Sequence, residues 1–113
     1  AVEDAKYLVF FDFDSARVDQ GGQSVIDSVV AEIRRQNISA VNVVGHTDTS
    51  GSNEYNERLG LRRANAVKKA LEERGIQATL IDAQTRGESQ LMVPTPEGVR
   101  EPANRRAEIT FVK

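Results

Sequence analysis

An arginine lies on the face of a predicted helix that should contact the protein interior. Residues 53–74 have helical periodicity, and at about 100° per residue Arg63 shares one stripe with Gly60 and Val67. An arginine on an inward stripe needs a partner, because an unpaired buried charge is costly. Two interpretations are open. Arg63 either extends past Val67 to solvent or pairs with an internal carboxylate, or it borders a cleft and binds a ligand anion.

The segment before this helix supplies an acid for such a cleft. Residues 45–53 are polar and contain two glycines, which predicts a loop between a strand and the helix. Such a connection directs backbone N–H groups outward at the helix N-terminus, where they attract anions. Asp48 in this loop and Arg63 on the helix would suit a zwitterion, the acid contacting the ammonium and the guanidinium the carboxylate. Asn56, on the same stripe, can both donate and accept hydrogen bonds.

The elements that position these residues follow from hydrophobic periodicity. We expect strands at residues 7–11, 41–44, 78–85 and 106–112, and helices at 23–36 and 53–74, with turn-like or loop segments at 12–22 and 86–103. The first strand is expected to be central and covered on both faces, and Gly75 is expected at the C′ position of the second helix. The order predicts an α+β fold: a two-layer β-α-β-α-β-β sandwich with a mixed four-stranded sheet and both helices packed on one face. The cleft would lie at the C-terminal edge of this sheet.

Composition limits the class of protein. The 113 residues correspond to one domain, and 39% hydrophobic with 28% charged residues is typical of a globular chain. The absence of cysteine excludes disulfides and thiolate metal sites, and a formal net charge of -2 argues against nucleic acid as a partner. There is no apolar run of about 18–20 residues and no signal-peptide pattern. We therefore expect one domain, residues 1–113, excised from a larger envelope protein, with any membrane attachment outside this chain.

Several motifs together closely resemble the outer-membrane protein A-like domain. They are Gly45-His46-Thr47-Asp48, Gly51, Tyr55-Asn56-Glu57-Arg58-Leu59, Arg62-Arg63-Ala64, the segment Asn104-Arg105-Arg106-Ala107-Glu108-Ile109 and the opening Val9-Phe10-Phe11-Asp12-Phe13-Asp14-Ser15. The matching segments extend over almost the whole chain. One departure is Gly60, which follows Leu59 where many relatives have serine. A glycine in mid-helix costs about 1 kcal/mol relative to alanine, so we expect it to permit a close approach to the sheet or to a ligand.

The resemblance implies a function and a set of site residues. It implies non-covalent binding of peptidoglycan through the meso-diaminopimelate of the stem peptide, which would tether an envelope protein to the cell wall. The two principal contacts would be Asp48 and Arg63, and Asn56 would be another. Further ligand contacts are expected from Thr47, Asp12, Asp14, Asn104, Arg105 and Arg106. The location implied is the periplasm of a Gram-negative bacterium, on a protein anchored in the outer membrane rather than the inner one. The parent architecture (porin-like, lipoprotein or motor stator) stays open.

Catalytic and metal-dependent alternatives have weaker signals. His46 is the only histidine, so a usual zinc set cannot be completed, and we expect it to bond the backbone near the loop. Asp12 and Asp14 could form an acid–base pair, but a turn with Asp14 as a cap is the simpler interpretation. Hydroxyl residues near His46 lack a Gly-x-Ser-x-Gly elbow. We therefore expect no enzyme activity, no cofactor and no metal. The competing hypothesis is an envelope protein–protein interaction module on the same fold.

Overall fold

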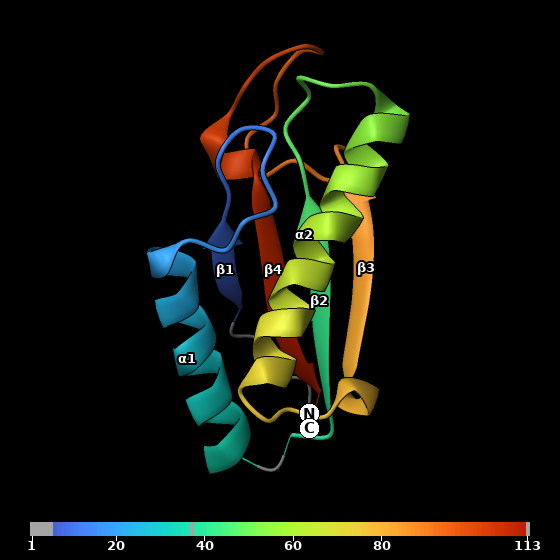
Figure 1. Cartoon of the computed structure of the whole chain (residues 1–113). Helices are drawn as coiled ribbons and strands as arrows, with labels where there is room; N and C mark the ends of the chain where they lie inside the picture. The colour runs from blue at the N-terminus through green and yellow to red at the C-terminus, as the bar shows by residue number, and fades with distance from the viewer. Residues whose placement is uncertain (1–5, 37, 113) are drawn as a thin grey trace.

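The computed structural model describes residues 6–36 and 38–112, and contains six main elements (Figure 1). In chain order they are β1 (Tyr7–Phe10), α1 (Gln20–Arg35), β2 (Ala40–His46), α2 (Asn53–Glu73), β3 (Ile81–Gly87) and β4 (Arg106–Val112). Two short 3-10 helices, Ala78–Leu80 and Pro102–Asn104, precede β3 and β4. This is the β-α-β-α-β-β order expected from the sequence.

The four strands form one mixed sheet in the order β1-β4-β2-β3, with α1 and α2 together on one face (Figure 1). Strands β2 and β3 are parallel and joined through α2, whereas β4 is antiparallel to both of its neighbours. The predicted α+β class and two-layer arrangement are therefore confirmed. The expectation that the first strand is central is wrong, because β1 is an edge strand and its Phe10 is 46% exposed. A short apolar run predicts a strand but not its place in the sheet.

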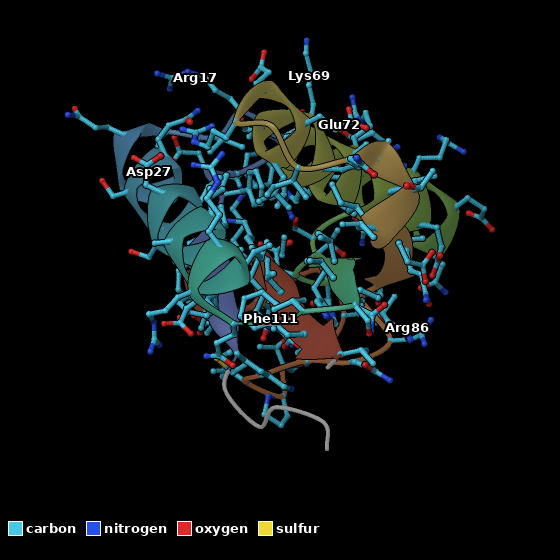
Figure 2. All side chains as sticks on the ribbon, turned by 90° about the horizontal axis from the view of Figure 1, so that it is seen from below. Arg17, Asp27, Lys69, Glu72, Arg86 and Phe111 are labelled. Atoms are coloured by element: carbon cyan, nitrogen blue, oxygen red, sulfur yellow. The ribbon has the colours of Figure 1, made fainter. Side chains whose placement is uncertain are left out.

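The core lies between the sheet and the two helices. The fully buried apolar side chains include Val9, Val41, Val43, Ile109 and Phe111 from the sheet, and Ile26, Val29, Val67 and Leu71 from the helices. Each contributes roughly 1.5–3 kcal/mol through the area it removes from water. The view along the helices shows charged side chains such as Arg17, Lys69 and Glu72 projecting outward around this core (Figure 2). In the described part of the chain, none of the helices combines the length and the hydropathy that a membrane span requires.

Both helices begin at a side-chain cap. Helix α1 starts at Gln20, three residues earlier than expected, because Asp19 accepts a hydrogen bond of 2.8 Å from the Gly22 amide. Helix α2 is capped by Ser52, whose hydroxyl accepts from the Tyr55 amide at 3.1 Å. Gly75 has a φ of 93° just after α2, as predicted for the C′ position.

The third strand is displaced from its expected position. We expected it over residues 78–85, but Ala78–Leu80 form a 3-10 turn and the strand runs from Ile81 to Gly87. The turn is closed by a hydrogen bond of 3.0 Å from the Leu80 amide to the Gln77 carbonyl. The buried Ile81 is the first residue to pair, opposite Val41 of β2. The short apolar run contains no signal that separates a turn from a strand.

Candidate ligand-binding site

A small hollow lies at the end of the sheet where the polypeptide leaves β1 and β2. Its volume is about 50 Å³, and it is lined by Phe13, Asp14, Asp48, Ser50, Gly51, Tyr55, Asn56, Leu59, Arg63 and Arg105. Three connections meet at this end of the molecule: the one after β1, the one between β2 and α2, and the one before β4 (Figure 1). The expected cleft at the C-terminal edge of the sheet is therefore present, and Asp48 and Arg63 both line it.

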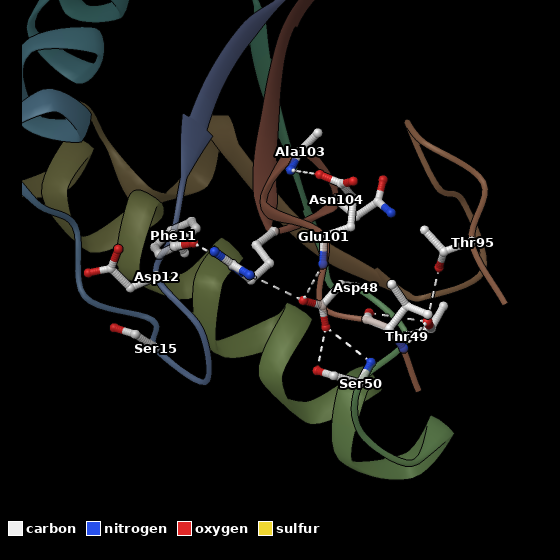
Figure 3. Close-up of polar contacts among 12 residues, drawn as sticks. Phe11, Asp12, Ser15, Asp48, Thr49, Ser50, Thr95, Glu101, Ala103 and Asn104 are labelled. Atoms are coloured by element: carbon white, nitrogen blue, oxygen red, sulfur yellow. Dashed lines mark hydrogen bonds and ion pairs between the residues drawn. The ribbon is translucent and has the colours of Figure 1, made fainter. Parts of the chain in front are cut away.

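Asp48 is almost fully withdrawn from water, at 3% exposure, and both of its carboxylate oxygens accept hydrogen bonds (Figure 3). Oδ1 accepts from the Ser50 amide at 3.1 Å and from the Ser50 hydroxyl at 2.5 Å. Oδ2 accepts from the Glu101 amide at 3.2 Å and lies 3.4 Å from Nη1 of Arg105. Burial raises the pKa of Asp48, but the donors from Ser50, Glu101 and Arg105 outweigh it and hold the pKa below its ordinary value. Asp48 is a buried anion.

Arg63 is completely buried, and its guanidinium bonds the main chain of two separate segments. Nε donates to the Ser15 carbonyl at 2.8 Å and Nη2 to the Asp12 carbonyl at 3.1 Å. Nη1 donates to the His46 carbonyl at 2.9 Å, and the guanidinium carbon lies 5.3 Å from the Phe11 ring centroid. The side chain thus joins the segment after β1 to the end of β2.

The environment of Arg63 fits neither form of the interpretation without a ligand, in which the side chain reaches solvent or pairs with an internal carboxylate. The side chain is not exposed to solvent, and among the described residues no carboxylate lies within 4 Å of it. Burial lowers the pKa of Arg63 to about 10, and the nearby Asp48 opposes this shift, so the guanidinium is charged at neutral pH. Three of the five N–H groups of a guanidinium are used by carbonyl oxygens. Within residues 6–36 and 38–112, the second N–H on each terminal nitrogen has no acceptor.

Two glycines allow α2 to approach the end of β2 closely enough for these bonds. A Cβ placed on Gly45 would lie 1.7 Å from the Gly60 carbonyl oxygen, and one on Gly60 would lie 2.2 Å from the Thr85 hydroxyl. The backbones of helix and sheet are therefore in contact at this crossing. The expectation that Gly60 permits a close approach is confirmed for the sheet, and the contact places Arg63, one turn further along α2, next to the His46 carbonyl.

Asn56 lines the hollow and is held by its own amide group. Its Nδ2 donates to the carbonyl oxygens of Asp48 and Gly51, at 3.2 and 3.1 Å, and to the Glu88 carboxylate at 2.9 Å. Its Oδ1 accepts no hydrogen bond from the described residues. The side chain thereby fixes the β2–α2 loop, and it retains an unused acceptor at the lining of the hollow.

The rim of the hollow carries a further acid and a further arginine. Arg105 donates from Nε to the Phe11 carbonyl at 3.0 Å and pairs with Asp48. The hydroxyl of Tyr55 donates to the carboxylate of Asp14, which has a left-handed φ of 53°. With Arg63, the lining contains two carboxylates and two guanidinium groups, so its formal charges sum to zero. Tyr55 was not among the predicted contacts, although it directly precedes Asn56 in the recognised motif.

Four of the expected contacts do not bring their side chains to the hollow. Asp12 contributes its carbonyl oxygen to Arg63, while its side chain is exposed. Thr47 is buried outside the lining, and Asn104 bonds the backbone amide and carbonyl of Val93, each at 2.8 Å. Arg106 precedes the core residue Ala107 in β4, and because adjacent strand residues point to opposite faces it extends over the face of the sheet away from the helices. Its Nη2 lies 2.7 Å from Glu108 there.

His46 belongs to that far face as well. Its side chain is 1% exposed, and neither ring nitrogen makes a hydrogen bond of full geometry within the described residues, although the backbone of Gln90 lies close enough to favour the protonated ring. Burial, assisted by the positive charge of Arg106, lowers the pKa of His46 to about 4, and Glu108 at 3.8 Å opposes this shift. Residues 6–36 and 38–112 contain no group of three or more His, Asp and Glu side chains that could bind a metal ion.

Comparisons with known proteins identify the family and the fold. The model of the OmpA family matches residues 10–105. The peptidoglycan-associated lipoprotein of Pasteurella multocida is 33% identical over 103 residues, which cover 91% of this chain and 69% of that protein. The crystal structure of the peptidoglycan-associated lipoprotein from Burkholderia pseudomallei superimposes with a TM-score of 0.85 at 28% identity, covering 94% of this chain and 90% of that one.

A third similar structure is the cell wall anchor of the T6SS from Pseudomonas aeruginosa, with a TM-score of 0.75 at 27% identity over 98% of this chain and 85% of that one. The chain spans only 12% to 53% of the length of several other curated relatives. The family match covers most of the sequence, and the strand order and helix placement are shared with the solved relatives. The chain belongs to the OmpA family.

Proposed function

We propose that this chain binds peptidoglycan non-covalently through the meso-diaminopimelate of the stem peptide, and so tethers an envelope protein to the cell wall. The location would be the periplasm, on a protein anchored in the outer membrane. The coarser part of the proposal, association with the wall, is supported by relatives described as a peptidoglycan-associated lipoprotein and a cell wall anchor. The domain acts by binding, without a catalytic step.

One observation supports binding through meso-diaminopimelate: a buried anion and a buried cation line the same hollow without pairing with each other. Asp48 and Arg63 are 3% and 0% exposed, and no ion pair within 4 Å joins them. The free end of diaminopimelate carries an ammonium and a carboxylate on one carbon. In this arrangement the carboxylate would accept the two uncommitted N–H groups of Arg63, and the ammonium would lie against Asp48.

The size of the hollow favours a ligand of this kind. About 50 Å³ is little more than the space of one or two water molecules, so only the tip of a ligand can enter. A sugar ring is excluded, whereas the charged end of an amino acid needs little room. A neutral sum of charges, from Asp14 and Asp48 with Arg63 and Arg105, matches a ligand that is itself neutral overall.

The direct test is a titration of the isotopically labelled wild-type domain with free meso-diaminopimelate, followed by NMR. We expect saturable shifts of the backbone amides of Asp48, Ser50 and Arg63 at millimolar ligand, because few atoms are in contact. Pimelate at the same concentration has both carboxylates but no ammonium group, and serves as the specificity control. Absence of shifts at these amides would exclude the site and would favour the envelope protein-interaction module.

A second test measures binding to the polymer. Purified sacculi should sediment the wild-type domain, and Asp48→Asn should reduce the bound fraction, with an affinity loss of roughly 10- to 150-fold for one charge-assisted bond. Asp48 also accepts structural hydrogen bonds, so a urea unfolding curve must show that the variant is folded. The exposed substitution Lys69→Gln is the matched control. Equal sedimentation of folded Asp48→Asn and wild type would contradict the assignment, and release of soluble muropeptides would indicate a hydrolase.

A further inference from the structure

A second, larger depression lies on the outer side of α2, next to the hollow. Its volume is about 420 Å³, and its lining consists of Tyr55, Arg58, Leu61, Arg62 and Asn65. We call it the α2 groove. Tyr55 lines both the groove and the hollow, so the two depressions adjoin at this ring. A ligand whose tip enters the hollow can therefore continue into the groove over Tyr55.

We propose that the α2 groove binds a carboxylate-bearing segment of the same wall peptide whose diaminopimelate enters the hollow. This inference rests on the proposed function and deepens it, because it assigns the position of the ligand beyond its tip. A hollow of about 50 Å³ leaves the rest of the peptide outside. That remainder must cross the rim in some direction, and the surface on each side determines which direction is favourable.

The charge of the groove favours an anionic segment. Arg58 and Arg62 lie one helical turn apart, so their side chains share one face of α2. Both are exposed, and in the described part of the chain neither lies within 4 Å of a carboxylate, although Glu54 and Glu57 belong to the same helix. Two cations without an internal counter-ion are therefore available to a ligand carboxylate.

Tyr55 connects these cations to the hollow. Its hydroxyl donates to Asp14 on the rim and accepts from Nη2 of Arg62 at 3.4 Å. The guanidinium carbon of Arg62 lies 5.8 Å from the centroid of the Tyr55 ring. Leu61, which is 40% exposed, adds apolar surface for the aliphatic part of a peptide. The path over Tyr55 is thus polar at the rim and cationic beyond it.

A second path away from the hollow is less suitable for the rest of the wall peptide. A depression of about 330 Å³ shares Arg105 with the hollow, and besides this arginine, which is already paired with Asp48, its lining contains two acids, Asp12 and Asp19. These carboxylates would repel a carboxylate of the ligand. The two exits therefore differ in sign, and the α2 groove is the one that attracts an acidic peptide segment.

The test measures how tightly the wild-type domain and one double variant bind each of two ligands. Affinities for free meso-diaminopimelate and for a soluble muropeptide, a disaccharide with a diaminopimelate-containing tripeptide, are measured by calorimetry or NMR. The double variant Arg58→Gln/Arg62→Gln should bind the muropeptide about 3- to 10-fold more weakly, the size expected for two solvent-exposed ion pairs. Its affinity for free diaminopimelate should stay within about twofold of wild type. The loss should shrink at high salt, since the pairs are screened.

Lys69→Gln is the matched control, because it removes one positive charge from the same exposed side of α2 two turns beyond Arg62 and does not line the groove. A double variant that binds the muropeptide as tightly as Lys69→Gln would overturn the assignment of the groove while leaving the hollow intact. Equal weakening of both ligands would also overturn it, because the effect would then belong to the hollow. A wild-type domain that binds neither ligand would overturn the proposed function and this inference together.

Discussion

Asp48 remains ionised although its side chain is almost withdrawn from water. Burial alone would raise its pKa, and the compensation comes from donors on three separate residues: Ser50 in its own loop, and Glu101 and Arg105 in the connection before β4. These donors fix the direction in which the carboxylate points. Such an acid is oriented before a ligand arrives, so less ordering accompanies binding.

His46 predicts a specific dependence of stability on pH. Its pKa is about 4 in the folded protein and 6.5 as its ordinary value. Between these values the unfolded chain binds more protons than the folded one, so the free energy of unfolding falls as pH falls through this window. A shift of this size corresponds to about 3 kcal/mol, lost progressively between pH about 6.5 and 4. Above pH 6.5 the contribution is constant.

Urea unfolding of wild type and His46→Gln at several pH values measures this contribution. The carboxylates other than Glu108 contribute equally to both proteins, so the difference between the two curves gives the contribution of the imidazole together with its interaction with Glu108. We expect His46→Gln to lose less stability than wild type on acidification. If the free energy of unfolding fell equally with pH in both proteins, protonation of His46 would carry no penalty. Glu108, 3.8 Å away, would then offset the effects of both burial and Arg106 on the protonated ring.

The sequence indicated Arg63 as a site residue but not what surrounds it. Its inward stripe position and the acid in the preceding loop were visible as spacings, and the structure places both on one hollow. The partners of the guanidinium are main-chain carbonyls of Asp12, Ser15 and His46. Every residue has a backbone carbonyl group, so the residue types in the sequence do not show which carbonyl groups will accept hydrogen bonds from Arg63. The same reason explains why Asp12 was expected to act through its side chain.

At the scale of elements, the crossing of α2 over β2 depends on the absence of two side chains. Gly45 and Gly60 bring the helix and strand backbones into contact, which gives Arg63 access to the end of β2. Alanine at position 60 would improve helix propensity by about 1 kcal/mol. The same methyl group would lie 2.2 Å from the Thr85 hydroxyl and 3.1 Å from the Gly45 carbonyl oxygen. The steric cost of overpacking is typically about 1–3 kcal/mol.

We therefore expect Gly60→Ala to destabilise the domain by about 1–2 kcal/mol, measured by urea unfolding, because the steric cost exceeds the gain in propensity. Gly21→Ala is the matched control, since that glycine lies in α1 and an added Cβ makes only an ordinary contact of 3.5 Å with Asp19. It should stabilise the domain or leave it unchanged. Combining Gly60→Ala with Thr85→Ser tests the cause, because the smaller residue can turn its hydroxyl away. A Gly60→Ala domain as stable as Gly21→Ala would show that the helix shifts without cost.

Helices and strands could be predicted from the sequence where the hydrophobic periodicity extends over many residues. Their boundaries were poorly predictable where a local turn determines the position at which an element begins. The stripe of α2 and its glycine at C′ were correct, since Gly75 has a left-handed φ. Helix α1 starts before the expected residue 23, because two adjacent glycines favour a turn in the sequence, whereas Asp19 caps a helix that contains both Gly21 and Gly22. The edge position of β1 depends on how β4 inserts between β1 and β2, which is a long-range pairing. No local pattern encodes that order.

At the scale of the whole molecule, the long connection before β4 is hydrogen-bonded to the loop that carries Asp48. Thr49 accepts from the Val99 amide at 3.1 Å and donates to the Pro96 carbonyl at 2.7 Å. Its own carbonyl accepts from the Gly98 amide at 2.8 Å. These bonds hold the connection against the β2–α2 loop, and the next contact along it is that of the Glu101 amide with Asp48 (Figure 3). The hollow is therefore assembled from chain segments that are distant in the sequence.

A hollow that admits only the tip of a ligand predicts weak binding by one domain and strong attachment by several. The contact is limited by the 50 Å³ available, and affinity per atom has a ceiling. A wall polymer, however, presents many identical peptides, so a second linked domain binds at a high effective concentration. Two copies joined by a flexible linker should bind sacculi about 10²- to 10⁴-fold more tightly than one copy, measured by sedimentation at decreasing protein concentration.

The informative control is the same fusion with Asp48→Asn in one copy, which keeps the size and charge of the tandem protein nearly constant. That fusion should bind like a single domain, because only one hollow remains. If it retained the affinity of the intact tandem, the gain would come from nonspecific adhesion, and attachment would not depend on the number of hollows.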